Sequence, residues 1–269
     1  MKLKPNDDEV IARLSAEADQ LSMESKYSAC FERMKLYEDE SYSPDVRRVA
    51  YLTHARCAVQ SGDFEEARTV VGKIDRSYIS AEVGIYVDKM LLQVLEHDGE
   101  LERAKKILLE NLNKPEILEP EHQEVHHEMV GWLGRILADL GEYERALPYL
   151  KQGEDYFERD SWRDNLAVRR AYCLRMLGRE SAAEEVLRAT LKEGSGEMLV
   201  DVFYELAMDY WAARRFEEAQ SMLELAAANI PCGLRTSTEV GEALAKLCTQ
   251  IQDLGLDEIS KKHKSTLPQ

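Results

Sequence analysis

The hexapeptide GEYERA at residues 141–146 decides the fold, because related phrases recur along the chain. The best copies begin with Gly and an acidic residue, have an aromatic residue or Leu third, and end in Ala. The other copies are GDFEEA at 62–67, GELERA at 99–104, and the looser GRESAA at 178–183, RRFEEA at 214–219 and SKYSAC at 25–30. Successive phrases end 37, 37, 42, 37 and 36 residues apart. An internal repeat of this period predicts a stack of similar structural units.

Each phrase has the composition of a tight turn between two helices. Gly suits the left-handed backbone that ends one helix, and acidic residues suit the first turn of the next helix. The final Ala lets the two helices approach closely. An apolar helical pattern precedes the phrase at 141–146 and another follows it, with Trp132, Leu133, Ile136, Leu137 and Leu140 before it and Ala146, Leu147 and Leu150 after it. Each unit is therefore predicted to be a helix hairpin, and stacked hairpins bury a continuous core.

The spacing predicts thirteen helices, which form six hairpins and one capping helix without a sheet, in a single domain over 1–269. The repeats are placed at about 7–40, 44–77, 81–114, 121–158, 161–193 and 197–231, with the capping helix at 237–254 and a polar tail at 256–269. The one long interval contains Pro115 and Pro120, and the loop between them is the only candidate break. Helix starts are predicted at four polar residues that suit N-caps. These are Ser43, Ser80, Ser161 with Asp164 as a capping box, and Thr236.

The pattern resembles the tetratricopeptide repeat (TPR) family. The resemblance rests on two sets of residues, which are Leu133-Gly134, Tyr143, Ala146 and Leu150, and Leu206-Ala207, Tyr210, Phe216, Ala219, Leu223 and Pro231. The period of 36 to 37 exceeds the family's period of about 34 residues, and Pro231 is the only closing Pro in register. Over residues 7–254 the resemblance implies an all-α, right-handed superhelical solenoid of about six TPR-like hairpins plus a C-terminal capping helix.

The composition excludes some classes of partner and location. The net charge is −16, which disfavours nucleic acid as a partner, because a phosphate backbone repels an acidic surface. A basic peptide, a basic protein face or simple solubility remain open as its meaning. No apolar run reaches the roughly 18 residues of a membrane span, and the N-terminus lacks a signal-peptide pattern. The five Cys are scattered without a CxxC pair, so we expect reduced thiols and a cytoplasmic protein.

Residues for catalysis or for holding a cofactor are not recognisable in the sequence. There is no phosphate loop or nucleophile motif, and Gly194-Ser195-Gly196 is interpreted as a short flexible hinge. His122 and His126 are spaced to share a helix face, but a third metal ligand is missing. We therefore predict no enzyme activity, no metal and no cofactor. Cys57 and Cys173 occupy equivalent positions of their repeats, where we expect small packing residues.

By the family resemblance, the first helix of each hairpin lines a concave groove, at positions 18, 15, 11, 8 and 7 residues before each phrase's last residue. The residues chosen from these positions as partner-binding candidates are Arg56, Tyr86, Arg135, Tyr172, Arg175, Met176, Tyr204, Met208 and Trp211. Their mixture of aromatic side chains, Met and Arg is typical of protein interfaces. The alternative, that Tyr and Met there pack between hairpins, stays open.

The main binding surface is predicted in the C-terminal half of this groove. There Tyr172, Arg175 and Met176 on one helix lie beside Tyr204, Met208 and Trp211 on the next. Acidic Asp201 and Glu205 nearby favour a ligand with some basic residues. The ladder of Lys, Asn and Arg by which the family's chaperone-tail clamp holds acidic tails is absent in register.

The predicted function is therefore that of a protein-interaction scaffold or adaptor that binds a peptide or protein in the groove. Two alternatives are a structural subunit of a larger assembly and a peptide-sensing regulator. Self-association distinguishes the first alternative, because an assembly subunit shows a mass that depends on concentration. A regulator of this class usually carries an effector domain, and no DNA-reading motif lies outside the repeats.

Overall fold

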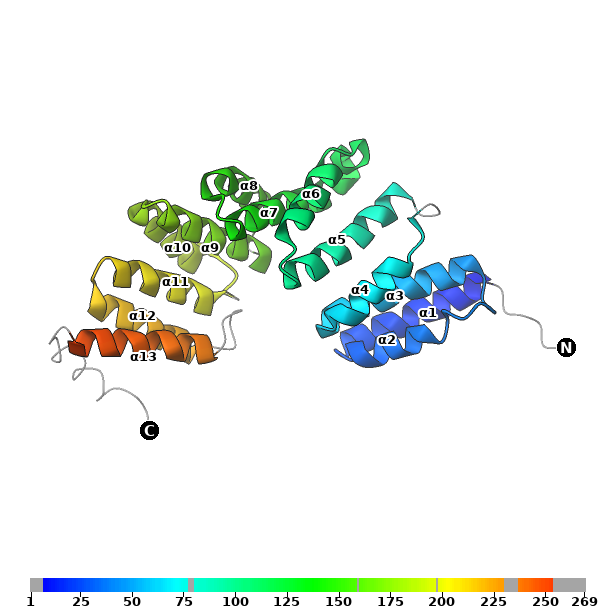
Figure 1. The fold of residues 1–269 in the computed structure, drawn as a ribbon, viewed down its shortest axis with the longest axis horizontal. Helices are drawn as coiled ribbons and strands as arrows, with labels where there is room; N and C mark the ends of the chain where they lie inside the picture. Colours follow the sequence, from blue (N-terminus) through cyan, green and yellow to red (C-terminus); the bar gives the residue numbers. More distant parts are fainter. Residues whose placement is uncertain (1–6, 77–79, 159, 197, 230–236, 254–269) are drawn as a thin grey trace. The chain divides into compact units, whose positions relative to one another are not determined.

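A computed structural model describes residues 7–76, 80–158, 160–196, 198–229 and 237–253. Within them the chain forms thirteen α-helices and no β-strand, which confirms the all-α prediction (Figure 1). The chain divides into two compact units, Met1–His122 (unit 1) and Gln123–Gln269 (unit 2). The division follows directly on the segment between Pro115 and Pro120 that the sequence marks as the candidate break. A single continuous solenoid over 1–269 stays a prediction.

Unit 1 contains six α-helices in its described residues. They are α1 (Asp7–Met23), α2 (Tyr27–Lys35), α3 (Pro44–Ser61), α4 (Phe64–Lys73), α5 (Ala81–His97) and α6 (Leu101–Leu112), followed by the 3-10 turns η2 (Pro115–Leu118) and η3 (Pro120–His122). Each first helix packs on its own second helix, and α3 also packs on both α1 and α5. The first helices α1, α3 and α5, which we call the inner helices of unit 1, therefore lie side by side with α3 in the middle.

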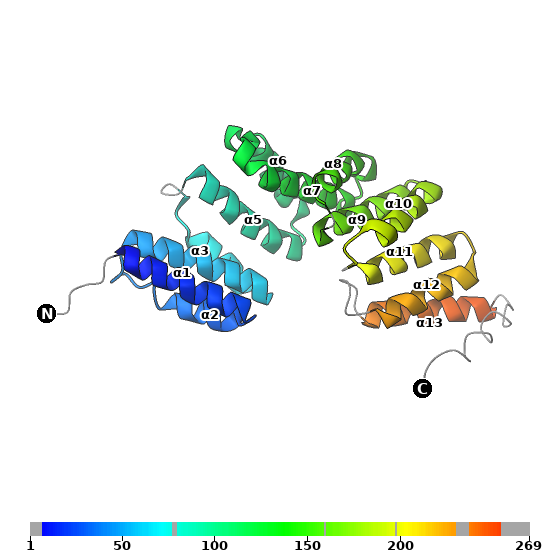
Figure 2. The same cartoon turned by 180° about the vertical axis from the view of Figure 1, so that it is seen from behind.

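Unit 2 repeats this arrangement. Its described helices are α7 (Gln123–Asp139), α8 (Tyr143–Tyr156), α9 (Ser161–Met176), α10 (Glu180–Glu193), α11 (Leu199–Ala212), α12 (Phe216–Ala228) and α13 (Ser237–Asp253). The first helices α7, α9 and α11 are again neighbours, because α9 contacts both of the others. The last helix, α13, packs against α12, as the predicted capping helix should (Figure 2). Its residues Val240, Ala243, Leu247 and Ile251 close the core formed by α9 to α12.

The repeated phrase has the structural role predicted for it. The first residue of every copy has a left-handed backbone, with φ of +54° at Ser25, +79° at Gly62, +73° at Gly99, +77° at Gly141, +71° at Gly178 and +59° at Arg214. The last residue of every copy, Ala in five copies and Cys30 in the first, is fully buried. A small side chain there lets the second helix of each hairpin pack closely.

The Leu133-Gly134 pair, which carries part of the family resemblance, marks a close approach of α7 and α8. A Cβ atom at Gly134 would lie 2.8 Å from the backbone nitrogen of Leu150. Only Gly leaves room for the α8 backbone at this distance.

The predicted helix starts are partly confirmed. The hydroxyls of Ser43 and Ser80 cap α3 and α5, where each accepts a backbone N–H at 3.3 Å. The capping box predicted at Ser161 is wrong, because the N-cap of α9 is Asp160. Asp164 is instead buried and accepts hydrogen bonds from the backbone N–H and the hydroxyl of Ser195, both at 2.7 Å. Ser195, in the segment interpreted as a short flexible hinge, is therefore anchored to α9.

Three sequence predictions fall outside the described residues. They concern Thr236, Pro231 and the polar tail at 256–269.

The expectation of reduced thiols is wrong for Cys30 and Cys57. These two side chains form a disulfide between α2 and α3, with their Cα atoms 6.1 Å apart, in the core of unit 1. The spacing in the sequence hides this pair, because the packing of two hairpins brings the positions together. Cys173 is a free, buried thiol, and its burial raises its pKa to about 11, which fits the predicted packing role. The cytoplasmic compartment stays a prediction.

Among the described residues, no helix combines the length and the apolar composition that a membrane span requires.

Candidate partner-binding surfaces

The predicted groove residues all lie on first helices of hairpins, in two groups. Arg56 on α3 and Tyr86 on α5 belong to unit 1, and the other seven lie on α7, α9 and α11 of unit 2. Each group is described within its own unit.

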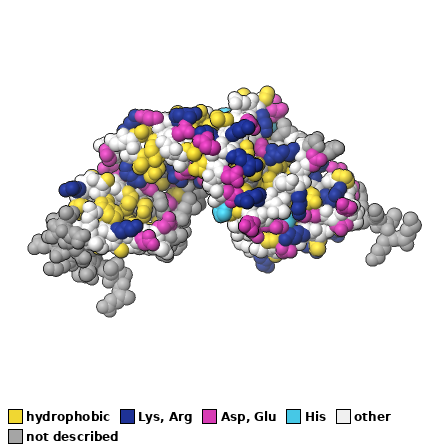
Figure 3. All heavy atoms as spheres, in the orientation of Figure 1, with side chains coloured by type: hydrophobic (Ala, Val, Ile, Leu, Met, Phe, Trp, Pro, Cys, Tyr) yellow, Lys and Arg dark blue, Asp and Glu magenta, His cyan; other side chains and the backbone are white. Residues whose placement is uncertain are grey.

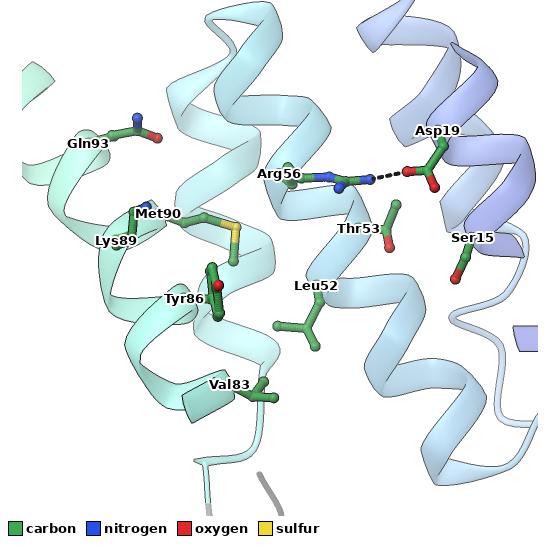
Figure 4. A pocket seen from close by; sticks show the side chains of 10 residues that line it. All are labelled: Ser15, Asp19, Leu52, Thr53, Arg56, Val83, Tyr86, Lys89, Met90 and Gln93. Carbon is green, nitrogen blue, oxygen red and sulfur yellow. Dashed lines mark hydrogen bonds and ion pairs between the residues drawn. The ribbon is translucent and has the colours of Figure 1, made fainter. Parts of the chain in front are cut away.

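In unit 1, the inner helices enclose a cleft of about 530 Å³ (Figure 4). The cleft is lined by Ser15 and Asp19 from α1, by Leu52, Thr53 and Arg56 from α3, and by Val83, Tyr86, Lys89, Met90 and Gln93 from α5. We call it the α1–α3–α5 cleft. The two inner-helix residues predicted for unit 1, Arg56 and Tyr86, therefore lie in one cavity.

Periodicity explains why these residues meet. Residues three and four apart on a helix share a face, so Leu52 and Arg56 of α3 point to the same side, as do Tyr86, Met90 and Gln93 of α5. Both faces turn toward each other, because α3 packs directly on α5. Ser80 fixes the first turn of α5 by capping it.

The cleft has an apolar centre and a charged rim. The side chains of Leu52, Tyr86 and Met90 point into the same space, and half of the Tyr86 surface is exposed (Figure 4). At the α1 side, Arg56 Nη2 lies 3.3 Å from Asp19 Oδ1, with both side chains exposed. An exposed ion pair of this kind contributes at most about 1 kcal/mol to stability, so a ligand can compete for either partner.

Sequence reasoning missed the contribution of α1. Ser15 and Asp19 stand 15 and 11 residues before Cys30, in the same register as Leu52 and Arg56 in the next repeat. The signal was present in the degenerate phrase SKYSAC at 25–30, to which the groove spacing applies as it does to the other copies. Val83 and Met90 lie outside the family's groove positions and needed the structure.

In unit 2, Arg175 pairs with two neighbouring carboxylates on α11. Its Nη2 lies 2.5 Å from Glu205 Oε2, and its Nη1 lies 3.1 Å from Asp209 Oδ1. Nη1 also donates to the Glu205 carbonyl at 3.2 Å. Burial raises the pKa of Asp209 to about 6, although Arg175 acts in the opposite direction. Arg175 therefore joins α9 to α11, and it is mostly buried. This role in packing competes with the predicted role in binding a partner.

The aromatic candidates of unit 2 are also partly occupied. The guanidinium carbons of Arg169 and Arg175 lie 5.8 and 5.4 Å from the centre of the Tyr172 ring. Tyr204, Met208 and Trp211 are half-buried against the core. The Trp211 indole N–H donates to the Gln250 side chain of α13.

The two remaining candidates of unit 2 are Met176 and Arg135. Met176 is exposed, with 49% of its surface accessible. The Arg135 guanidinium lies 5.4 Å above the Trp162 ring.

The reason given for a basic ligand at this surface does not hold. Asp201 and Glu205 are both buried, and Glu205 is paired with Arg175. Neither carboxylate is presented to a ligand.

The histidines also differ from expectation. His122 ends the turn η3, whereas His126 belongs to α7, so the two do not share one α-helix. The His127 ring stacks on Tyr156 with centres 4.1 Å apart. The described parts of the chain contain no group of three or more His, Cys, Asp or Glu side chains placed to hold a metal ion.

Comparison with known proteins agrees with this architecture. The family model of the tetratricopeptide repeat matches residues 127–157, which cover most of α7 and α8. No curated protein matches the chain in sequence. One repeat of the chain therefore matches the tetratricopeptide repeat family in sequence, and the chain has a fold that such proteins share. This fold is generally a non-catalytic scaffold for protein interaction.

Three solved structures show the shared fold. A Rap protein complexed with Competence and Sporulation Factor aligns with a TM-score of 0.62 at 15% identity, over 96% of this chain and 76% of that one. A tetratricopeptide repeat protein from Parabacteroides merdae gives 0.55 at 15% identity, over 89% and 98%. The C-terminal part of a TPR repeat-containing protein from Cytophaga hutchinsonii gives 0.52 at 14% identity, over 79% and 78%.

Proposed function

We propose that this protein is an interaction scaffold that holds a peptide segment of a partner protein in the α1–α3–α5 cleft. The observation that carries the proposal is the register of the lining residues. Positions 15 and 11 before the end of the phrase line the same cleft in three successive repeats, as Ser15 and Asp19, Leu52 and Arg56, and Lys89 and Gln93.

The chemistry of the cleft suits a peptide. A volume of about 530 Å³ lies within the range of ligand pockets, which is about 300–1,000 Å³. Leu52, Tyr86 and Met90 offer an apolar seat for a side chain of the partner, and Met adapts its shape readily. Thr53 and Gln93 at the wall can hydrogen-bond a peptide backbone. Rigid Tyr side chains lose little conformational entropy on binding, which makes Tyr86 a suitable anchor.

The surface of unit 2 remains the alternative location for the partner. Its aromatic side chains make contacts within the protein, and only Met176 among its candidates is exposed. In the α1–α3–α5 cleft, the lining residues Asp19, Arg56, Tyr86 and Gln93 are exposed, and Lys89 Nζ lies 5.8 Å from the centre of the Tyr86 ring. The Rap protein with a similar fold was solved in complex with Competence and Sporulation Factor, which supports the general idea that this fold accommodates a second molecule.

Peptide selection followed by hydrogen exchange tests the proposal. Random peptides displayed on phage are selected against the full chain, and a selected peptide is then added during hydrogen–deuterium exchange. We expect slower exchange in α1, α3 and α5, because an occupied cleft restrains the helices that line it. Failure to select any peptide, or slower exchange confined to α9 and α11, would overturn the proposal.

A further inference from the structure

A second cavity of about 530 Å³ lies in unit 1, between α3 and the end of α4. Its lining residues are Pro44, Arg47, Arg48, Tyr51, Lys73, Ile74 and Asp75. We call it the α3–α4 cavity. It shares no lining residue with the α1–α3–α5 cleft, although both use α3. A ligand of this cavity would therefore contact a different set of residues from the proposed peptide.

The helical period gathers cations on one side of the cavity. Pro44, Arg47, Arg48 and Tyr51 are spaced by three, one and three residues, so they share one face of α3. Lys73, the last residue of α4, lies opposite them, with its Nζ 5.8 Å from the centre of the Tyr51 ring. Three of the seven lining residues are cationic and one, Asp75, is acidic. The cavity is thus a basic site in a protein whose net charge is −16.

The three cations differ in how far the protein neutralises them. Arg48 Nη2 lies 2.8 Å from Asp45 Oδ1, and Lys73 Nζ lies 3.5 Å from Glu38 Oε2. The Glu38 carboxylate also contacts His54. The Arg47 side chain has no hydrogen bond or ion pair within the described ranges, and its Nε is buried without an acceptor, although the Asp39 carboxylate lies near enough to interact with it electrostatically. The terminal nitrogens Nη1 and Nη2 of Arg47 are not buried in this way, so an anion in the cavity can reach them.

We propose that the α3–α4 cavity binds an oxyanionic group, a phosphate or a carboxylate, and that Arg47 is its principal contact. The planar guanidinium presents paired N–H donors that match the oxygens of either group. Arg48 and Lys73 add positive charge; Asp45 beside Arg48 is exposed, and Glu38 lies 3.5 Å from Lys73. The Tyr51 ring closes the apolar side of the cavity together with Ile74.

Calorimetric titration of the full chain with inorganic phosphate, and separately with succinate, tests this proposal at constant ionic strength. We expect saturable binding of at least one anion by the unmodified protein, and the preferred anion identifies the group. Arg47→Gln should weaken binding by at least about tenfold, because the best-placed donors are lost. Arg68→Gln is the control, since it removes an exposed Arg of α4 that lines neither cavity, and it should bind the anion normally.

Lys73→Gln provides a second test if Arg47→Gln disturbs folding, which circular dichroism detects. It should also weaken binding. Absence of saturable binding in the unmodified protein would overturn the proposal, as would equal binding by Arg47→Gln and Arg68→Gln. Neither result bears on the peptide cleft.

Discussion

Arg214 has the same left-handed backbone as Gly178 in the preceding repeat, with φ of +59° against +71°. The hydrogen bonds that close the two turns also correspond. The N–H of Arg215 donates to the Tyr210 carbonyl at 2.8 Å, and that of Arg179 donates to the Leu174 carbonyl at 2.9 Å. The turn geometry is thus imposed by hairpin packing even where the sequence does not supply Gly.

Arg214→Gly should stabilise the protein by about 1 kcal/mol. A side chain in the left-handed region costs about 1–2 kcal/mol, part of which is offset by the extra freedom of Gly in the unfolded chain. The Arg214 side chain is exposed, so few contacts are lost. Urea denaturation measures the change. The reciprocal variant Gly178→Arg should lower stability by a similar amount, and a loss of stability in Arg214→Gly would show that the side chain has a role of its own.

Gly134→Ala should destabilise the protein by about 1–3 kcal/mol. The added methyl group would meet the Leu150 backbone at 2.8 Å, so α7 and α8 would have to separate. Gly241→Ala is the matched control, because Gly241 lies within helix α13 with nothing within 4 Å of its Cβ position. That change should stabilise the helix by up to about 1 kcal/mol. Thermal or urea unfolding distinguishes the two, and equal effects would contradict the close approach.

Asp209 should make stability depend on pH. Its pKa in the folded protein is about 6, raised mainly by burial, against an ordinary value of 3.8. The folded state therefore keeps a proton that the unfolded state has already lost between these values. The free energy of unfolding consequently falls as pH rises from about 4 to about 6, by up to about 3 kcal/mol from this group.

Asp209→Asn isolates the effect, because Asn does not titrate. The difference in unfolding free energy between the natural protein and Asp209→Asn should fall across this pH range and become constant above about pH 7. A difference that stays constant from pH 4 upward would mean that Asp209 ionises normally in the folded state.

The sequence predicts the repeat register well because the turn phrase is a local signal. Left-handed Gly and buried Ala are required within a few residues of each other, so GEYERA at 141–146 reveals both the helix ends and the packing position. Ser43 and Ser80 are similarly local, because an N-cap bonds its own helix. These elements depend on neighbours four or fewer residues away and were predicted, whereas the N-cap Asp160 of α9, which is equally local, was missed.

Contacts between repeats could not be predicted in the same way. Asp164 has the position of a capping residue, yet it accepts hydrogen bonds from Ser195, which lies 31 residues later. The sequence predicts Arg175 as a groove residue, but in the fold Glu205 and Asp209 of α11 lie beside it and pair with it. Cys30 and Cys57 likewise meet only through the packing of α2 on α3. Each of these pairs is set by tertiary packing, for which one sequence contains no periodic signal.

The two candidate surfaces predict that a partner contacts different residues, Tyr86 in one case and Trp211 in the other. Tyr86 is half exposed in the α1–α3–α5 cleft, whereas Trp211 is partly buried and bonded to Gln250. A partner in the cleft must contact Tyr86 and need not contact Trp211.

The most direct test is the affinity of one phage-selected peptide for the natural protein, for Tyr86→Ala and for Trp211→Ala, measured by calorimetry. Tyr156→Ala, which also truncates an exposed Tyr, serves as the control. A central aromatic anchor contributes about 2 kcal/mol or more, so Tyr86→Ala should weaken binding by about 30-fold. We predict unchanged affinity in Trp211→Ala and Tyr156→Ala. Unchanged affinity in Tyr86→Ala together with a loss in Trp211→Ala would contradict the account and place the partner on α9 and α11.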